Sequence, residues 1–260
     1  MHQSSLTCFG VGDGFPCADR NHASFLYRLR NSSVLIDCGE SVDSCYQSSD
    51  LSYDLFDSIL ISHLHADHIA GLFMLIQGCW LEGRRKPLRI YLPDSAIAVV
   101  RSMLAASFLF EELFKFRLEL LPLKPGRAVA VRDIRVTPFQ TTHLDRTRGQ
   151  FQKKYGNIFE SFCFLLERGR LRIGHSADLG RPEDLDPLFS KPVDLLVCEM
   201  SHFTAEEILS YLALRPVQRV VFVHLARPYW AKLPQLRRLA AKKMPHIPHT
   251  FARDGAVIPF

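Results

Sequence analysis

Three histidines and an aspartate fall within six consecutive residues of this chain: His63, His65, Asp67 and His68. Imidazole nitrogens and carboxylate oxygens are typical protein ligands of zinc and related metals. A lone histidine more often forms a hydrogen bond in the core or at the surface. A His-x-His-x-Asp-His run, however, is expected by chance in roughly one of a thousand chains of this composition, so it indicates a metal site.

The elements around this run can direct its side chains into one cavity. Residues 58–62 form a compact apolar segment that suits a strand buried on both faces, and helical spacing of apolar residues begins at Asp67. His63 and His65 are two apart in an extended loop and can point the same way. Asp67 and His68 occupy the first helical turn and can face the same cavity from another side.

Three more ligand-type residues each follow a strand-like segment: His143, Asp178 and His224. Side chains at strand ends along one edge of a sheet converge on a common cleft, which is where α/β enzymes place reactive groups. We therefore expect these residues to join the histidine-rich run.

The order of elements along the chain predicts the architecture. Strands cluster early, helices intervene, and strands cluster again from residue 161 before further helices. Two mixed sheets packed face to face with helices outside satisfy this α/β order. Without repeats or linkers, we expect one domain over residues 1–260.

Residues 145–157 are predicted to form a basic loop at the cleft mouth. The aromatic segment 108–116 is predicted to be core, with a partner surface as the alternative.

These features resemble the metallo-β-lactamase fold superfamily, a four-layer αββα sandwich, and especially its ribonuclease Z branch. The resemblance covers nearly the whole chain. Beyond the ligand-type residues, it rests on four segments: residues 10–16, 20–21, 35–40 and 61–72.

The resemblance implies a dinuclear centre that holds two Zn²⁺, with Mn²⁺ or Fe as alternatives. Two sets of three ligands would be joined by one bridging carboxylate: His63, His65 and His143; Asp67, His68 and His224; and Asp178 as the bridge. Asp67 would also orient or deprotonate the attacking water.

Further candidate residues also come from the resemblance. Glu199 and His202 match a Glu-Ala-Thr and a His-Ser-Thr-Ala motif that are compressed into one here, which implies that His202 protonates the leaving group and Glu199 binds substrate. The alternative is that His202 merely caps a helix near Thr204. Arg227 resembles part of a Ser-x-Arg-Tyr ending and is a candidate phosphate contact, or else a solvated or ion-paired arginine. His22 is a candidate cleft residue.

The chain also departs from ribonuclease Z. Only 35 positions separate His143 from Asp178, too few for the long arm that grips transfer RNA in that branch. Ala177 and Leu179 replace the usual glycine and threonine, and His175 is expected to support the bridging Asp178. Small phosphodiesterases of the branch, which act on cyclic nucleotides or cyclic ribose phosphates, are therefore the better model of substrate size.

We accordingly expect a zinc-dependent phosphodiesterase that hydrolyses a nucleotide-like or RNA 3′-end phosphodiester through a metal-activated water. A lactone, ester or thioester hydrolase of the same fold is the alternative. A non-catalytic binding relative is disfavoured, because the full set of seven ligands is present. The resemblance also suggests a homodimer.

Composition limits the remaining possibilities. The 260 residues are 47% hydrophobic and 23% charged, which excludes disordered, collagen-like and disulfide-stapled chains. Seven scattered cysteines without a Cys-x-x-Cys pair favour a reducing compartment. No secretory signal or apolar run of membrane-spanning length is evident, so we expect a cytoplasmic protein with no membrane partner. The net charge of +5 is concentrated in the second half and carries little weight alone.

Overall fold

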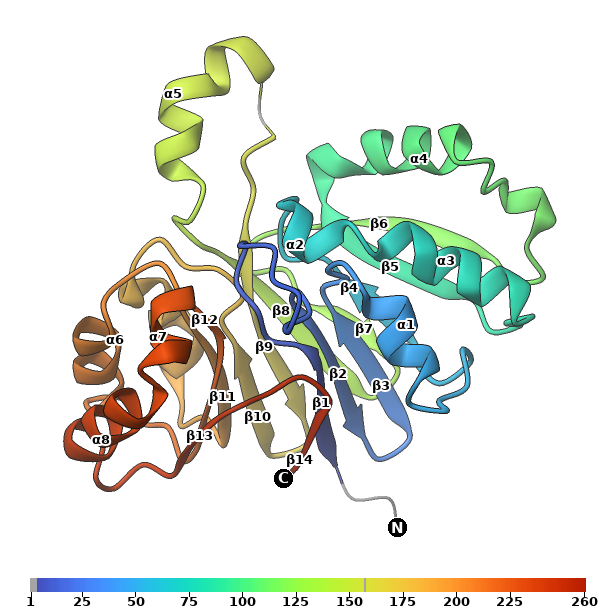
Figure 1. Cartoon of the computed structure of the whole chain (residues 1–260). Helices are drawn as coiled ribbons and strands as arrows, with labels where there is room; N and C mark the ends of the chain where they lie inside the picture. The colour runs from blue at the N-terminus through green and yellow to red at the C-terminus, as the bar shows by residue number, and fades with distance from the viewer. Residues whose placement is uncertain (1–3, 157) are drawn as a thin grey trace.

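Two mixed sheets form the centre of the molecule. The computed structural model describes residues 4–156 and 158–260, so residues 1–3 and Asn157, the last residue of the predicted basic loop, lie outside the described residues. Within these residues, each sheet has seven strands (Figure 1). The first runs in the order β14 (Ala256–Pro259), β1 (Ser5–Gly10), β2 (Ser24–Leu29), β3 (Ser32–Ile36), β4 (Ser58–Leu60), β5 (Leu88–Pro93) and β6 (Leu118–Leu123). The second runs in the order β13 (His249–Phe251), β12 (Val220–Leu225), β11 (Leu195–Met200), β10 (Leu171–His175), β9 (Phe162–Arg168), β8 (Ile134–Gln140) and β7 (Val129–Val131).

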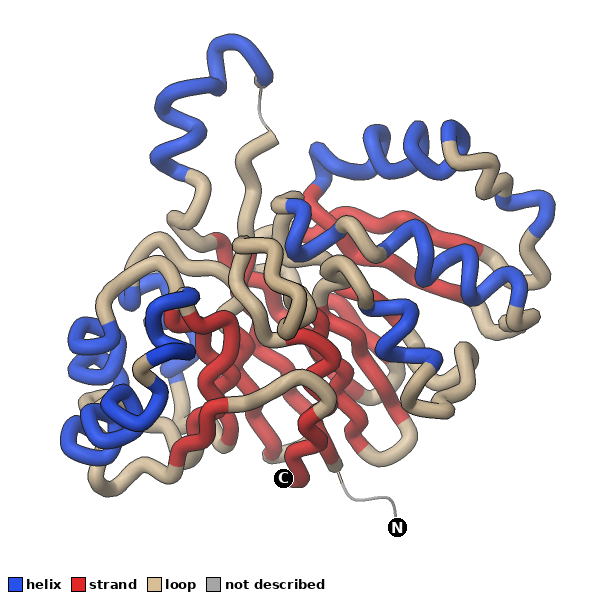
Figure 2. Tube along the Cα trace, viewed as in Figure 1, coloured by secondary structure: helices blue, strands red, loops and turns tan. Residues whose placement is uncertain are grey.

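Helices flank both sheets (Figure 2). The first half of the chain contributes α1 (Val42–Gln47), α2 (Ala66–Ile69), α3 (Leu72–Leu81), α4 (Ile97–Ala106) and the short 3₁₀ helices η1 (Asp94–Ala96) and η2 (Glu111–Leu113). The second half contributes α5 (Asp145–Tyr155), η3 (Pro182–Ser190), α6 (Ala205–Leu212), α7 (Arg227–Ala231) and α8 (Leu233–Lys243).

Three apolar clusters hold the layers together. One lies between the sheets and includes Tyr27 and Ile36 of the first sheet and Phe164 and Val197 of the second. The other two lie where each sheet packs against its own helices. Strands covered on both faces have no exposed side, which is why every residue of β3 is buried. The predicted pair of sheets with outer helices, a four-layer αββα sandwich, is confirmed.

The helix predicted from Asp67 onward is interrupted. It forms two helices, α2 and α3, that meet at Gly71. The Gly71 amide donates to the Cys38 carbonyl at 2.9 Å, and a Cβ on Gly71 would lie 2.2 Å from the Gly39 carbonyl oxygen. This close approach brings α2 against the end of β3, so the break helps to place Asp67 and His68.

The predicted basic loop is largely a helix, α5, and this prediction was therefore wrong in its secondary structure. Figure 1 shows α5 projecting away from the body of the molecule, and none of its residues is buried. A turn-rich composition with Gly149 concealed its helical preference. Its basic residues, which include Lys153 and Lys154 in the last turn, interact favourably with the negative end of the helix dipole.

The aromatic segment 108–116 is only partly core. Leu109 and Phe116 are buried, whereas the Phe108 side chain is 73% exposed and Phe110 is also exposed. The prediction of core therefore holds for only part of the segment, because a short 3₁₀ turn cannot place all of these aromatic residues on one face. No helix among the described residues has the length and apolar character needed to span a membrane.

Candidate metal centre

The seven ligand-type residues of the sequence meet at one end of the two sheets. His63 and His65 lie in the loop after β4, and Asp67 and His68 lie on α2. The other three follow or end strands of the second sheet: His143 after β8, Asp178 after β10 and His224 in β12. The cleft is therefore built by strand ends from both sheets.

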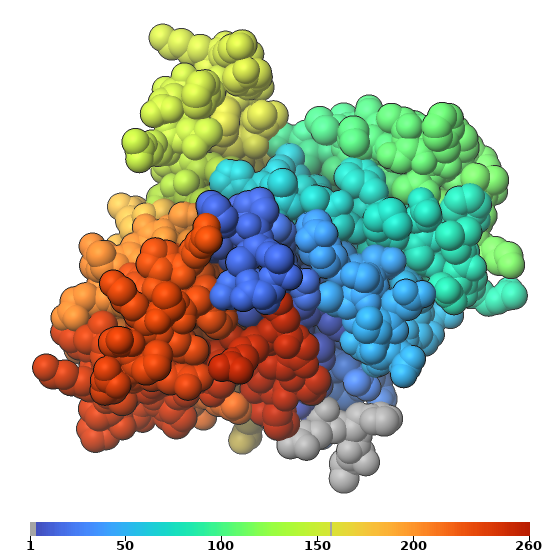
Figure 3. Space-filling view, viewed as in Figure 1, coloured from blue at the N-terminus to red at the C-terminus, as the bar shows by residue number. Residues whose placement is uncertain are grey.

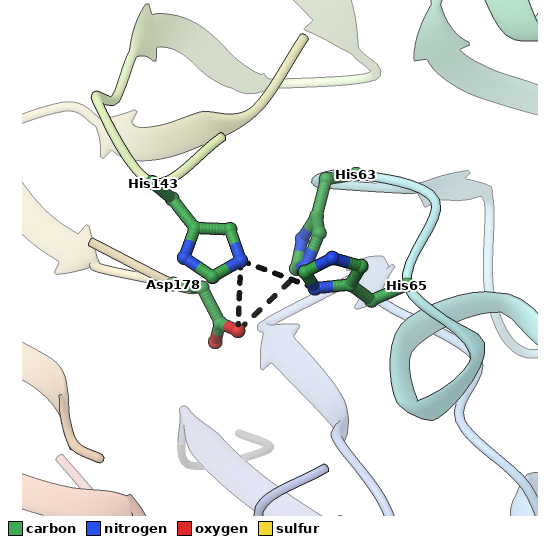
Figure 4. Close-up of side chains that lie close together, drawn as sticks. All are labelled: His63, His65, His143 and Asp178. Atoms are coloured by element: carbon green, nitrogen blue, oxygen red, sulfur yellow. Dashed lines mark hydrogen bonds and ion pairs between the residues drawn. The ribbon is translucent and has the colours of Figure 1, made fainter. Parts of the chain in front are cut away.

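The first group of ligand atoms comes from His63, His65, His143 and Asp178 (Figure 4). One ligand atom from each lies within 4.8 Å of all the others. Figure 4 shows the two loop histidines on one side and His143 with Asp178 on the other. His143 Nε2 is 3.1 Å from His65 Nδ1 and 3.6 Å from Asp178 Oδ2, and His63 Nε2 is also 3.6 Å from that oxygen.

The second group comes from Asp67, His68, Asp178 and His224. His68 Nε2 is 3.3 Å and His224 Nδ1 is 3.6 Å from Asp178 Oδ1. Asp178 thus directs one carboxylate oxygen to each group. This is the arrangement expected of a carboxylate that bridges two cations, and the His/Asp clusters are typical of a dinuclear metal site.

The donor atoms fit metal ions. Burial lowers the pKa of His63 and His65 and lowers that of His143 to about 4, so these rings are neutral, which is the form that binds metal. Within the described residues, His63 Nε2 and Asp178 Oδ1 are buried and have no hydrogen-bond partner. Unpaired buried polar atoms are rare in proteins, and here they face the shared space between the side chains.

The second group attracts positive charge strongly. Burial alone would raise the pKa of Asp67 and Asp178, but their histidine neighbours outweigh it and hold both pKa values below the ordinary one. Burial likewise opposes charge on His68 and His224, yet the charge of Asp178 helps to raise both pKa values. Two buried carboxylates therefore favour a cation at this position.

Asp37 and Ser62 orient the ligand side chains, a role that the sequence reasoning missed. His68 Nδ1 donates to Asp37 Oδ2 at 2.7 Å, so its Nε2 faces the cluster. Ser62 Oγ donates to the same oxygen at 2.8 Å and lies 3.0 Å from His63 Nδ1. A carboxylate behind a metal-binding histidine is a recurrent arrangement. The available signal was an aspartate directly after the apolar residues 34–36.

Asp37→Asn should weaken metal binding about 10–100-fold, because an amide holds His68 less firmly in the ligating orientation. Titration of the metal-free protein against a chromophoric chelator measures this affinity. Asp57→Asn is a matched control, since Asp57 accepts a backbone hydrogen bond at the other end of β3, from Ser33. Equal metal affinity in the Asp37 variant and the wild type would contradict the assignment.

Left-handed backbone turns the chain at three points of the site. Asp37, Ala177 and His224 have φ angles of 60°, 44° and 48°. Such angles cost about 1–3 kcal/mol each in non-glycine residues and concentrate at functional sites. Ala177, which stands where glycine is usual in ribonuclease Z, adopts the conformation that glycine accepts without strain.

His202 and Glu199 form a third group beside the cluster. His202 Nδ1 donates to Glu199 Oε1 at 2.8 Å, and His202 Nε2 lies 3.8 Å from Asp178 Oδ2. Burial disfavours the charged ring, but the hydrogen bond and charge of Glu199 raise the pKa of His202 to about 9. Thr204, and not His202, caps α6, because its hydroxyl accepts from the Glu207 amide.

Glu199 lies behind His202 and away from the cleft surface. Its side chain is fully buried and accepts hydrogen bonds from the amides of Leu179 and Ser201 as well as from His202. This differs from the expectation that Glu199 contacts substrate directly. The carboxylate has no exposed surface, and its oxygens accept hydrogen bonds from neighbouring groups of the protein.

The loop after β1 closes the other side of the centre. In Figure 3 this segment, in blue, lies between the C-terminal helices in orange and the cyan helices. The His224 amide donates to the Val11 carbonyl, and a Cβ on Gly14 would lie 3.3 Å from Asp67 Oδ2. Arg227 is exposed and its guanidinium carbon lies 4.4 Å from the centre of the Phe15 ring, so it sits at this loop.

His175 differs from its predicted supporting role. Its ring lies between the sheets, and its Nδ1 atom is 2.8 Å from the Tyr27 hydroxyl. Burial lowers the pKa of His175 to about 3, so it is a neutral core residue. His175 is the last residue of β10 and lies three positions before Asp178. From sequence alone, a core histidine at this position is hard to distinguish from one that supports Asp178.

Comparison with known proteins agrees with this geometry. The chain has the metallo-β-lactamase fold and is related to ribonuclease Z. A family model described as the anti-Pycsar protein Apyc1 matches residues 4–210, and the chain belongs to this family.

Curated relatives include ribonucleases Z. The protein from Archaeoglobus fulgidus is 29% identical over 144 residues, which cover 55% of this chain and 46% of that relative. The protein from Gloeothece citriformis is 27% identical over 219 residues, which cover 75% and 67%. The chain thus spans less than half the length of the archaeal relative.

Solved structures show the same fold. The metallo-β-lactamase fold protein YhfI from Bacillus subtilis has a TM-score of 0.78 at 20% identity and covers 98% of this chain and 99% of its own. The human short-form tRNase Z has a TM-score of 0.72 at 20% identity and covers 98% and 100%. Yeast PDE1 has a TM-score of 0.71 at 15% identity and covers both chains fully.

Proposed function

We propose that this protein is a dinuclear zinc-dependent phosphodiesterase that hydrolyses a nucleotide-like phosphodiester, with cyclic nucleotides as the preferred class. The observation that supports it most is the shared carboxylate of Asp178 between two ligand groups, with His202 beside it. Membership of the Apyc1 family and the shortness of the segment between His143 and Asp178 favour a small substrate over transfer RNA.

In this proposal, the seven ligand-type residues hold two metal ions. His63, His65 and His143 would hold one ion, Asp67, His68 and His224 would hold the second, and Asp178 would contribute an oxygen to each. Imidazole and carboxylate ligands, without thiolate, suit Zn²⁺. Bound metal lowers the pKa of a water and neutralises charge on the phosphate oxygens.

The chain's own side chains move the protons. Asp67 Oδ2 lies at the cluster beside Gly14, where it can orient the attacking water and accept its proton. His202 carries a proton on Nε2 and gives it to the departing alkoxide, while Glu199 fixes its orientation through Nδ1. Arg227, stacked on Phe15, supplies a positive contact for the phosphate or the base as the substrate enters.

A comparison of two substrate classes tests the proposal. Metal-free protein and protein reconstituted with Zn²⁺ are assayed with bis(p-nitrophenyl) phosphate, with 3′,5′-cyclic AMP and with a simple lactone. We expect phosphodiester hydrolysis that depends on metal. Turnover of the lactone alone would reject the proposal in favour of a lactone hydrolase that uses the same metal centre.

A further inference from the structure

A cavity of about 590 Å³ opens beside the metal cluster. Its wall includes Asp67 of the second ligand group, the loop residues Gly14, Pro16 and Cys17, and two residues outside the ligand set, His22 and Glu40. The volume is within the range of small-ligand sites. It accommodates the part of a substrate that is bonded to the reacting phosphate.

His22 forms part of the wall of this cavity, and both of its ring nitrogens are buried. Its side chain is only 12% exposed, and neither ring nitrogen has a hydrogen-bond partner within residues 4–156 and 158–260. Polar atoms buried to this extent are nearly always hydrogen-bonded. The ring therefore points to a ligand group with which it can form a hydrogen bond.

The position of His22 next to the cluster is fixed by close backbone packing. A Cβ on Gly39 would lie 2.7 Å from His22 Cβ and 2.4 Å from the Asp67 carbonyl oxygen. His22 therefore packs close to the backbone of a proposed metal ligand. Because His22 and Asp67 line the same cavity, a phosphate bound at the cluster would have its neighbouring group within reach of His22, and in a nucleotide that group is the sugar.

Glu40 limits which chemical group of a ligand can bind to His22. Its Oε2 atom is 3.9 Å from His22 Nδ1, too far for a direct hydrogen bond, and the carboxylate is 66% exposed at the cavity. Because the carboxylate lies on the Nδ1 side of the ring, it favours the tautomer with the proton on Nδ1, so a group between them accepts a hydrogen bond from the imidazole and donates one to the carboxylate. One hydroxyl oxygen does both, whereas an amino group only donates and a carbonyl only accepts.

We propose that His22 and Glu40 bind the sugar 2′-hydroxyl of the substrate and make the enzyme selective for ribonucleotides over 2′-deoxyribonucleotides. This inference rests on the proposed function. In a 3′,5′-cyclic ribonucleotide the 3′ and 5′ oxygens belong to the phosphodiester, so the 2′-hydroxyl is the only free hydroxyl of the sugar. It is a donor and an acceptor, the property by which proteins distinguish RNA from DNA.

The test compares 3′,5′-cyclic AMP with its 2′-deoxy analogue on the zinc-loaded protein. The readout is the ratio of the two kcat/KM values, which a general loss of activity does not change. We expect the wild type to prefer the ribonucleotide at least about tenfold, because the deoxy analogue leaves the His22–Glu40 pair unpaired. His22→Phe, which keeps a ring but removes both nitrogens, should bring the ratio close to one.

A second variant keeps the test decisive if His22→Phe fails to fold. Glu40→Ala alters an exposed side chain and should lower the ratio as well. The control is Glu112→Ala, which removes an exposed carboxylate that does not line the cavity and should keep the wild-type ratio.

The outcomes separate this inference from the proposed function. Hydrolysis of both cyclic nucleotides with equal efficiency, or a ratio unchanged in both variants, would overturn the sugar site and leave the phosphodiesterase intact. Hydrolysis of bis(p-nitrophenyl) phosphate but of neither cyclic nucleotide would overturn the cyclic-nucleotide substrate and the sugar site together. Failure to hydrolyse any phosphodiester would overturn the proposed function itself.

Discussion

Asp178→Asn will abolish binding of the metal pair and lower phosphodiester hydrolysis by more than about 100-fold. Loss of a residue that only supports a metal ligand costs up to about 100-fold, and loss of a ligand itself should cost more. Asp178 directs Oδ1 to His68 and His224 and Oδ2 to His63 and His143. An amide keeps the shape but replaces one of these oxygens by an NH₂ group and removes the negative charge. One ligand group therefore loses its donor oxygen, and both groups lose the negative charge that they share.

Metal analysis of the purified variant, together with kcat/KM, checks this prediction. The control is Asp186→Asn, which alters an exposed carboxylate on η3 paired with Arg215 and should keep full metal content and activity. Thermal unfolding of both variants in the presence of chelator shows whether the Asp178 variant is folded. A folded Asp178→Asn protein that holds two metal ions per chain and retains activity would refute the bridging role.

Sequence spacing was sufficient to find the cluster because its residues obey local rules. His63 and His65 alternate in an extended loop, and Asp67 and His68 begin a helix, so four ligand-type residues are visible within one short stretch. The later residues were found because each stands at a strand end. The layered fold follows from the same strands and helices, whose buried faces must be covered.

Asp37, which sequence reasoning missed, acts across a long separation in the chain. Asp37 reaches His68 from the end of β3, 31 positions away, and its importance depends on the parallel pairing of β3 with β4. The orientation of the Glu199 side chain likewise depends on the loop around Leu179, because Glu199 accepts a hydrogen bond from the Leu179 amide. No periodicity within one element encodes such contacts.

The helix α5 shows the opposite limitation. Its residues have no apolar face directed at the core, so hydrophobic periodicity gave no helical signal. Local helix formers such as Gln152, Lys153 and Lys154 favour the helix without burial. Patterns based on burial therefore recognise the elements that build the core more readily than an element that projects from it.

His202→Ala should reduce hydrolysis of 3′,5′-cyclic AMP about 10²–10⁴-fold, the usual contribution of a general acid, and should affect bis(p-nitrophenyl) phosphate much less. The difference arises from the leaving groups. The departing ribose oxygen is a poor leaving group until it is protonated, whereas p-nitrophenoxide leaves as a stable anion. The measurement is kcat/KM for each substrate at fixed zinc concentration. Equal losses for both substrates would indicate that His202 acts only on the structure of the metal centre.

The pH profile gives a second, independent readout of the same role. A pKa of about 9 means that His202 carries its proton below this pH and loses it above, so cyclic AMP hydrolysis should decline as pH rises through about 9. Glu199→Gln removes the charge that raises this pKa and should move the decline to lower pH. Glu206→Gln, on an exposed site of α6, is the control and should leave the profile unchanged. Because a merely structural Glu199 would lower activity without moving the profile, the shift distinguishes a residue that sets the proton affinity of His202 from one that only supports the fold.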